Sequence, residues 1–491
     1  MLSYDAVIGS VSKSLYNNRS PSDMDAARSI VSKLQIPKTS SKVWQIGTFV
    51  GIIVLMCCYF FTGRWYKYTY AQYRSEPVSI QRLLTIKRKK LSDAIDPLYP
   101  STNSVCSQLI AKQGFYSQID VSKTAVVNWR PLTVRLAGYL GGIHTARDGV
   151  FDMTKGIQLA LAQGARAFVF DIDYLDVAPC DPVIIHRDNG GYMRSLHTGK
   201  ILEGMKALAN MAFTANYDPV MIIIYLRRIP KLASQQDSFF KGIAASLDPI
   251  SGYHLGMNEQ GSFHNCKSES VLFTSPITNY QKQFIVLTNY NTNTLPETPN
   301  PKDNLDFWTN ARIWVDESGK SSVLGEVTSS VPPGQIPYAQ MGATTQLLNI
   351  GSADQPNYIQ TSSNTFKIAM GDLEVKLSNA QLHTLMNTLG IQCVPIDVIA
   401  AAATKDHANT IKTTNKGPKT IKDLSNSMND KDPLSFWAFA GWSHKLIVEG
   451  FQDAAPVPLA TPIQGFIIPP AVVPKRPPVS TNSNGGLVSI G

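Results

Sequence analysis

The chain has 491 residues, an apolar content of 43% and a formal net charge of +9. That composition is ordinary for a protein with a sizeable core and excludes a disordered chain, while the length exceeds one average domain. The positive charge is concentrated, because eight Lys or Arg residues and only three acidic residues lie between residues 64 and 100. A basic cluster next to an apolar segment indicates an anionic lipid surface as partner, and not a nucleic acid.

The N-terminal part predicts a membrane anchor. Residues 1–42 are polar, and residues 43–63 contain no charged side chain. At about 1.5 Å per residue, this segment is long enough to cross the hydrocarbon layer of a bilayer as one transmembrane helix. A signal peptide would be shorter and nearer the N-terminus. More basic residues follow the segment than precede it, so we expect a single-pass protein with its C-terminal domain on the cytosolic side.

Residues 64–103 follow as a basic connector, and residues 104–450 are expected to form one domain. Residues 75–135, which include Pro77, Pro97 and Pro100, are expected to connect the N-terminal part to the first strand of that domain. The stretch from Leu136 to Arg228 alternates apolar runs with amphipathic helical patterns. The predicted strands are 136–143, 164–175, 182–186 and 220–226, and the predicted helices are 149–163 and 197–213. Continuous apolar strands alternating with helices indicate a parallel sheet covered on both faces. The fold class is therefore α/β, with a single TIM-like β/α barrel.

The pattern continues beyond Arg228 and ends in a tail. The later predicted elements are helices at 231–247 and 378–389, strands at 283–288 and 311–315, a buried strand at 392–398, an exposed hairpin strand at 367–377, and a closing segment at 434–448. Residues 451–491 are rich in Pro, Ser, Asn and Gly, and such a segment cannot bury a core by itself. We expect a tail that either stays mobile or lies extended on a protein partner.

Polar residues stand where the apolar runs end, as in the active sites of β/α barrels. They are His144, Asp171, Asp173, His186 and Arg227. Asp171 and Asp173 share a parity, so a strand that stays regular through both aims both carboxylates into the barrel. Without a cation such as Ca²⁺ or Mg²⁺ they would repel each other. In that case the strand is expected to end near Asp171 and to leave Asp173 in a loop.

Four short sequence motifs resemble those of a known family. They are Gly-Ile-His144, Gly-Ala-Arg166 leading to Asp171, Val-Ile-Ile-His186, and the apolar run that ends in Arg227-Arg228. The stretch resembles the X domain of phosphatidylinositol-specific phospholipases C and, more loosely, glycerophosphodiester phosphodiesterases. The resemblance implies a β/α barrel in which His144 is the base and His186 the acid. It further implies that Arg227, Arg187 or Arg166 binds the phosphate, and that Asp171 or Asp173 orients an imidazole or holds a metal ion.

The sequence also departs from that family. Calcium-dependent members have Asn after the first His and Glu two residues before the strand Asp, where this chain has Thr145 and Val169. Metal-independent members have Asp after that His and Arg two residues past the strand Asp, where this chain has Thr145 and Asp173. Neither known catalytic set is therefore intact.

Two functions follow from these patterns. The first is a membrane-anchored, catalytically degenerate barrel that bridges a membrane and a protein assembly. An example would be a protein that connects the inner membrane of a large DNA virus to its capsid. The alternative is an active phosphoric diester hydrolase or lyase that acts on phosphoinositide or glycerophosphodiester head groups through His144 and His186. Neither function needs a cofactor other than Ca²⁺ or Mg²⁺.

Overall fold

The structure is a computed structural model of the whole chain. The residues that it describes are 47–59, 78–98, 120–141, 149–188, 191–256, 271–315, 327, 331, 337–373, 375–397 and 441–445. The chain divides into two compact units, Met1–Thr69 and Tyr70–Gly491. The predicted tail, the segment 1–42 and most of the closing segment 434–448 lie outside the described residues, and the predicted domain boundaries stay predictions.

In the first unit, residues 47–59 form a helix whose side chains are all exposed. This helix covers only the middle of the predicted span 43–63, and the rest of the span is not described. Among the described residues, no helix is both long enough and apolar enough to cross a bilayer. The predicted transmembrane helix is therefore not found among the residues that the structure describes.

The second unit is built around a ring of parallel strands. Its strands are β1 (Trp129–Pro131), β2 (Thr133–Arg135), β3 (Tyr139–Leu140), β4 (Val150–Phe151), β5 (Ala167–Tyr174), β6 (Pro182–Ile184), β7 (Val220–Leu226), β8 (Phe284–Thr288), β9 (Ala311–Arg312), β10 (Trp314–Val315), β11 (Ala339–Ala343), β12 (Phe366–Met370) and β13 (Trp442–His444). One parallel path runs β2-β5-β7-β8-β9, and a second runs β10-β11-β12. The two paths are joined at Ile313, whose amide donates to the Thr288 carbonyl at 2.7 Å.

The ring closes through residues 393–396. Cys393 forms a parallel bridge with Ile368 of β12, and Ile396 forms a parallel bridge with Val134 of β2. The Ile396 amide donates to the Thr133 carbonyl at 3.0 Å. Every strand path therefore has a neighbour on both sides, which is the arrangement of a β/α barrel.

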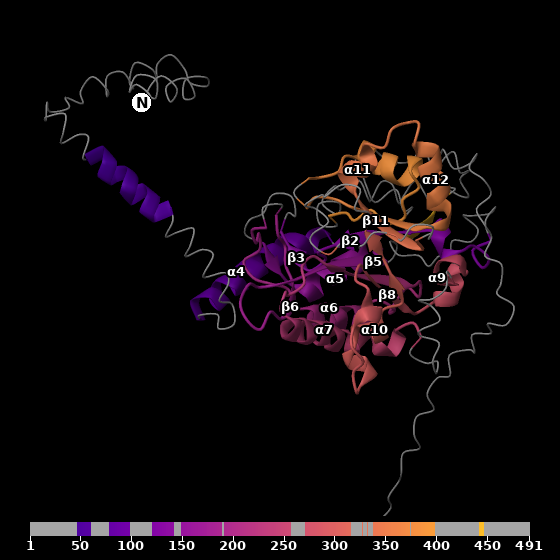
Figure 1. Cartoon of the computed structure of the whole chain (residues 1–491), viewed down its shortest axis with the longest axis horizontal. Coiled ribbons are helices and arrows are strands. Elements are labelled where there is room, and N and C mark those ends of the chain that lie inside the picture. The colour runs from indigo at the N-terminus through magenta and orange to yellow at the C-terminus, as the bar shows by residue number, and fades with distance from the viewer. Residues whose placement is uncertain are drawn as a thin grey trace, which may run out of the picture. The chain divides into compact units, whose positions relative to one another are not determined.

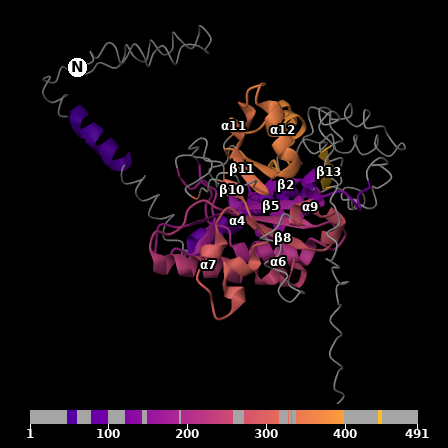
Figure 2. The ribbon, with the colours of Figure 1, turned by 45° about the vertical axis from the view of Figure 1, so that its right-hand side comes forward.

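Helices follow most of the strands and cover the outside of the ring. They are α4 (Val78–Ile95), α5 (Met153–Ala162), α6 (Ile201–Met211), α7 (Ala233–Leu247), α9 (Val271–Thr274), α10 (Leu305–Trp308), α11 (Thr344–Leu348), α12 (Gln355–Asn364), α13 (Asn379–His383) and the π-helix Thr384–Thr388. Helices α6, α7 and α10 lie together on one side of the strands, and α11 and α12 lie on the opposite side near β11 (Figures 1 and 2).

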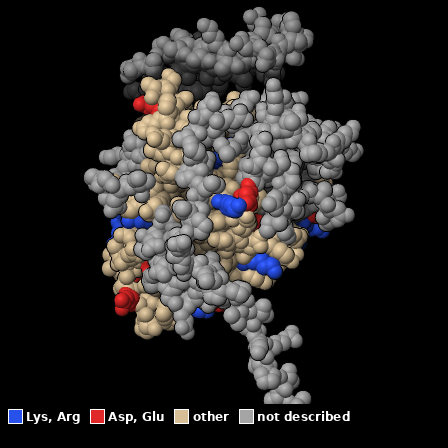
Figure 3. All heavy atoms as spheres, turned by 90° about the vertical axis from the view of Figure 1, so that its right-hand side faces the viewer, with Lys and Arg blue, Asp and Glu red and all other residues tan. Residues whose placement is uncertain are grey.

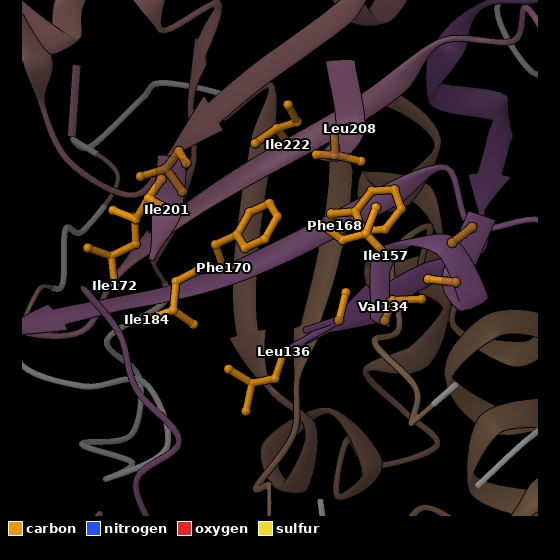
Figure 4. Packing of buried hydrophobic residues seen from close by; sticks show 14 of the residues in the cluster. Val134, Leu136, Ile157, Phe168, Phe170, Ile172, Ile184, Ile201, Leu208 and Ile222 are labelled. Carbon is orange, nitrogen blue, oxygen red and sulfur yellow. The ribbon is translucent and has the colours of Figure 1, made fainter. Parts of the chain in front are cut away.

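The core has two parts, one on each face of the strands. Alternate residues of β5, such as Phe168 and Phe170, pack outward against the helices, with Ile157 of α5 and Leu208 of α6 among their cluster (Figure 4). Ala167 and Val169 of β5 point inward and join a second cluster that fills the ring. This two-faced burial explains why β5, β7 and β8 read as continuous apolar runs.

Four sequence predictions are corrected by the structure. The first ring strand is β2, which lies before the predicted run 136–143, because Leu136 adopts a positive φ of 52° and turns the chain away. Strand β6 is antiparallel to β5 and lies off the main path of the sheet. The predicted hairpin strand 367–377 overlaps β12, which is a buried parallel strand. The predicted connector ending at residue 135 contains α4, β1 and β2.

Candidate functional site

Charged side chains gather at the carboxyl ends of β2, β5 and β7. Arg135 pairs in register with Val169, so its side chain lies on the same face of the sheet as that of Asp171. The Arg135 guanidinium binds both oxygens of Asp171, Nε to Oδ1 at 2.7 Å and Nη2 to Oδ2 at 2.5 Å. Its Nη1 donates to the Gly371 carbonyl at 2.8 Å. Both charged side chains are buried, so this is a desolvated ion pair inside the ring.

Asp173 is bound by two other arginines. Arg187 Nε lies 2.6 Å from Oδ2, and Arg228 Nε lies 2.7 Å from Oδ1. Both guanidiniums also donate to the Tyr174 carbonyl. Strand β5 continues through Asp171 and Asp173, so the prediction that it ends near Asp171 is wrong. Each carboxylate has its own guanidinium partner, and the repulsion behind that prediction does not arise.

A Ca²⁺ or Mg²⁺ ion does not fit the site expected at Asp171 and Asp173. These ions need several free oxygen ligands, whereas the oxygens of both carboxylates accept hydrogen bonds from arginine. A cation placed there would also be repelled by the guanidiniums. Among the described residues, no group of three or more His, Cys, Asp or Glu side chains could hold a metal ion.

His186 lies close to Asp171. It follows β6, and the amide of the preceding Ile185 donates to the Asp171 carbonyl at 3.3 Å. The imidazole is 1% exposed and meets the Tyr139 ring edge-on, with 4.7 Å between the ring centroids. Neither ring nitrogen has a hydrogen-bond partner in the described part of the chain. A buried polar group left unpaired costs about 1–3 kcal/mol, so this imidazole destabilises the fold unless something binds it.

Burial lowers the pKa of His186 to about 4. The Asp171 carboxylate opposes this shift, while Arg135, Arg194 and Arg227 add to it because they disfavour another positive charge. The imidazole is therefore neutral at neutral pH and able to accept a proton. The resemblance implied an acid at this position, and an acid would require a bound anion that raises the pKa again.

Arg227 follows β7 and approaches the same carboxylate. Its Nη1 lies 3.8 Å from Asp171 Oδ2, which is too far for a hydrogen bond. Within the described residues, the Arg227 guanidinium donates no hydrogen bond, and its side chain is 10% exposed. Its N–H groups are therefore available to an anion at this end of the ring.

The remaining predicted residues do not join this cluster in the described structure. His144 lies outside the described residues, between strands β3 and β4, which pair with each other. Arg166 stands at the amino end of β5, where its Nη1 donates to the Ala212 carbonyl at 2.9 Å. It is therefore far along the strand from Asp171. Arg187 is occupied by Asp173.

Arg135 was not among the site residues predicted from the sequence. Residues 75–135 were expected to be a connector, because the apolar run begins only at Leu136. The available signal was the short alternation Thr133-Val-Arg135, which ends in a basic residue as the strand before Arg227 does.

Comparison with known proteins gives distant structural likenesses. The sequence matches no protein-family profile and no curated protein. The structure of PLC21 from L. pealei is similar at 14% identity and a TM-score of 0.40, with 66% of this chain and 37% of that chain covered. This chain thus spans little more than a third of PLC21.

Two bacterial structures are similar at comparable levels. A calcium-dependent phosphoinositol-specific phospholipase C from Pseudomonas sp has 12% identity and a TM-score of 0.32, with 57% of this chain and 92% of that chain covered. A Ca²⁺-dependent phosphatidylinositol-specific phospholipase C from Streptomyces antibioticus has 11% identity and a TM-score of 0.34, with 57% and 96% covered.

Proposed function

We propose that the protein is a metal-independent phosphoric diester hydrolase whose substrate binds at the carboxyl ends of β2, β5 and β7. The observation that carries this proposal is the buried His186 imidazole, which has two unpaired nitrogens beside a group of arginines. A phosphate bound there would supply the missing hydrogen-bond partner and would accept from the free N–H groups of Arg227. Positive charge aimed at the phosphate also stabilises the transition state of its cleavage.

In the proposed reaction, Arg227 binds a nonbridging phosphate oxygen. His186 accepts the proton of the attacking hydroxyl, which comes from water or from the substrate itself. A new P–O bond forms as the bond to the leaving alcohol breaks, and the leaving alcohol takes up a proton. The resemblance implied the opposite roles, with His144 as the base and His186 as the acid. The lowered pKa of His186 makes this residue the base here, and we propose His144 as the donor of that proton. Arg135 neutralises Asp171, so this carboxylate does not repel the phosphate.

A catalytically silent barrel that serves as an interaction module is the second candidate. The observation that favours it is the burial of His186, which is 1% exposed and packed against Tyr139. A group that no substrate can reach cannot take part in catalysis. In this case the sequence-based proposals would remain: attachment to an anionic membrane through residues 43–63 and to a protein assembly through the tail 451–491.

Hydrolysis of a soluble diester, bis(p-nitrophenyl) phosphate, by the full-length protein in EDTA distinguishes the two candidates. We expect turnover by the wild type and a loss of about 10² to 10⁴ in kcat for His186→Ala, as is typical for a lost acid or base. Arg227→Gln should raise KM. The exposed His383 provides the matched control, His383→Ala, which should behave as wild type.

Unchanged kcat in His186→Ala would contradict the proposed role of this residue. Absence of turnover by the wild type, with this diester and with glycerophosphoinositol, with and without Ca²⁺, would favour the silent barrel.

A further inference from the structure

Helix α4 presents one basic side to solvent. Arg82, Ile86, Lys89 and Lys90 recur at i, i+4, i+7 and i+8, which places them on one side of the helix, and Leu83 adjoins them. All five side chains are exposed, with Leu83 at 46% and Ile86 at 57%. We refer to these five residues as the basic face. Along its whole length, α4 has five basic residues and a single acidic one.

The opposite side of α4 is fixed to the barrel. Leu84 and Ile95 are buried in the cluster that lies between the strands and the helices. Arg88 Nη2 donates to the Phe151 carbonyl at 2.9 Å and to His197 Nε2 at 3.1 Å. These contacts fix the rotation of α4 about its axis, so the basic face points away from the barrel.

The contacts of α4 lead to the candidate site. The Phe151 ring, whose backbone carbonyl binds Arg88, lies 5.4 Å from the Tyr139 ring, and Tyr139 lies 4.7 Å from the His186 ring. The helix thus packs against the β3–β4 pair, and that pair contacts His186. A surface bound by α4 would therefore lie next to the β3–β4 pair, which contacts His186.

We propose that the basic face docks the barrel onto a bilayer that contains anionic phospholipids. Lys and Arg side chains meet the phosphate groups, and the exposed Leu83 and Ile86 enter the boundary between head groups and acyl chains. Two apolar residues bury little area, so docking depends on anionic lipid. Delivery of a lipid phosphodiester to His186 and Arg227 would follow, and this second step rests on the proposed function.

Charge and apolar exposure together favour a membrane over a nucleic acid. Phosphate contacts of a nucleic acid would use the basic residues of α4 but would leave Leu83 and Ile86 exposed to water. On the face seen in Figure 3, by contrast, the Lys and Arg side chains lie apart from one another.

Flotation of the full-length protein with vesicles tests the docking surface without any need for activity. The vesicles consist of phosphatidylcholine with or without phosphatidylserine. The triple variant Arg82→Glu, Lys89→Glu, Lys90→Glu should lower binding to phosphatidylserine vesicles by about 100-fold, since each basic residue near the surface contributes roughly a factor of five. A matched triple variant, Lys206→Glu, Lys231→Glu, Lys376→Glu, makes the same charge change at exposed sites outside α4 and should retain binding.

The apolar contribution has its own comparison. Leu83→Ser with Ile86→Ser should weaken vesicle binding, whereas Leu232→Ser with Val375→Ser, at sites of similar exposure, should not. Equal losses in the two triple variants, or flotation of the α4 triple variant as wild type, would overturn the proposal. Binding of duplex DNA that the α4 triple variant abolishes, with vesicle binding retained, would also overturn it.

Hydrolysis of the soluble diester separates this inference from the proposed function. If both are right, the α4 triple variant keeps turnover of the soluble diester and loses turnover of phosphatidylinositol in vesicles. If the wild type cleaves no diester and the α4 triple variant loses vesicle binding, the docking surface is supported and the proposed function is contradicted. Turnover of vesicle phosphatidylinositol that is unchanged in the variant would defeat the delivery step.

Discussion

Asp171 is buried with one guanidinium bound at two points and a second guanidinium nearby. Exposed ion pairs contribute about 0–1 kcal/mol, because water already solvates both partners. Removing one partner of a buried pair costs about 3–5 kcal/mol, because the other charge is left without compensation. The Arg135–Asp171 pair is of the second kind, so its importance for folding can be measured independently of catalysis.

We predict that Asp171→Asn lowers the free energy of unfolding by about 3–5 kcal/mol, since Asn keeps the shape but leaves the Arg135 charge uncompensated. Urea denaturation measures this loss. Asp237 forms an exposed pair with Lys241 at 2.8 Å, and Asp237→Asn should cost less than about 1 kcal/mol. Equal losses in the two variants would show that the buried pair is dispensable.

His186 makes stability depend on pH. Its pKa is about 4 in the folded chain and about 6.5 in an unfolded one. Between these values the unfolded chain binds more protons, so stability is fully present above pH 6.5 and falls as the pH drops toward 4. The contribution of this one residue is on the order of 3 kcal/mol.

We therefore predict that His186→Gln loses less stability than wild type between pH 7 and pH 4.5, as measured by urea denaturation at each pH. The exposed His383 serves as control, and His383→Gln should show the wild-type pH dependence. Parallel pH dependences for wild type and His186→Gln would contradict the lowered pKa.

At the scale of elements, buried parallel strands were the most predictable part of the chain. β7 covers the predicted run 220–226, and β8 lies within 283–288. Strand β12 was misread because the run 367–377 alternates in the manner of an exposed strand, beginning with Lys367. The Lys367 amine is in fact inside the protein, 3.0 Å from the Thr361 hydroxyl and 3.8 Å from the Tyr358 ring centroid. A long side chain can carry its charge to a polar partner, so a charged residue in an alternating run does not establish an exposed face.

Helix α5 packs very closely on the chain that follows β2, and Gly156 permits this approach. A Cβ atom at Gly156 would lie 1.8 Å from the Ala137 carbonyl oxygen, whereas one at Gly252 would meet no atom within 4 Å. Ala is a better helix former than Gly by about 1 kcal/mol, but here the contact with backbone cannot be relieved by a side-chain rotation.

We predict that Gly156→Ala lowers the midpoint of thermal unfolding and that Gly252→Ala leaves it nearly unchanged, with calorimetry as the measurement. A stabilising effect of Gly156→Ala would mean that α5 can move away from Ala137.

At the scale of the molecule, closure of the ring was expected from the family resemblance, but the residues that make it were only partly predictable. The segment 392–398 was predicted as a late strand, and its Cys393 and Ile396 do bridge β12 and β2. β2 itself was missed, because three residues are too short a run to show a period. The residues of the candidate site were likewise only partly predictable. Asp171, His186 and Arg227 stand at ends of apolar runs, whereas the partnership of Arg135 with Asp171 depends on which strands are neighbours.

The amino end of the ring is closed by residues that lie far apart in the sequence. β1 pairs with β13, and the Leu132 amide donates to the Gly441 carbonyl at 2.7 Å. Trp442 is fully buried in the cluster that fills the ring, and its Nε1 donates to the Pro219 carbonyl at 3.2 Å. Because this side chain contacts the interior of the ring itself, its packing should contribute to the stability of the whole barrel and not only to that of β13.

We predict that Trp442→Ala lowers the free energy of unfolding of the barrel by about 3–5 kcal/mol, the range for a large core aromatic, while unfolding remains a single transition. Trp442→Phe should cost less, because the ring still fills most of the space and only the hydrogen bond to Pro219 is lost. The exposed Tyr192 provides the control, Tyr192→Ala, with a change within about 0.5 kcal/mol.

Hydrogen exchange measures how far through the barrel the effect of Trp442→Ala extends. Faster exchange of amides in β5 and β7 of Trp442→Ala would show that the barrel unfolds as one cooperative unit, since those strands are distant in sequence from the substitution. Faster exchange confined to β1 and β13, with an unchanged unfolding midpoint, would show instead that β13 is only an attachment to a ring that is stable without it.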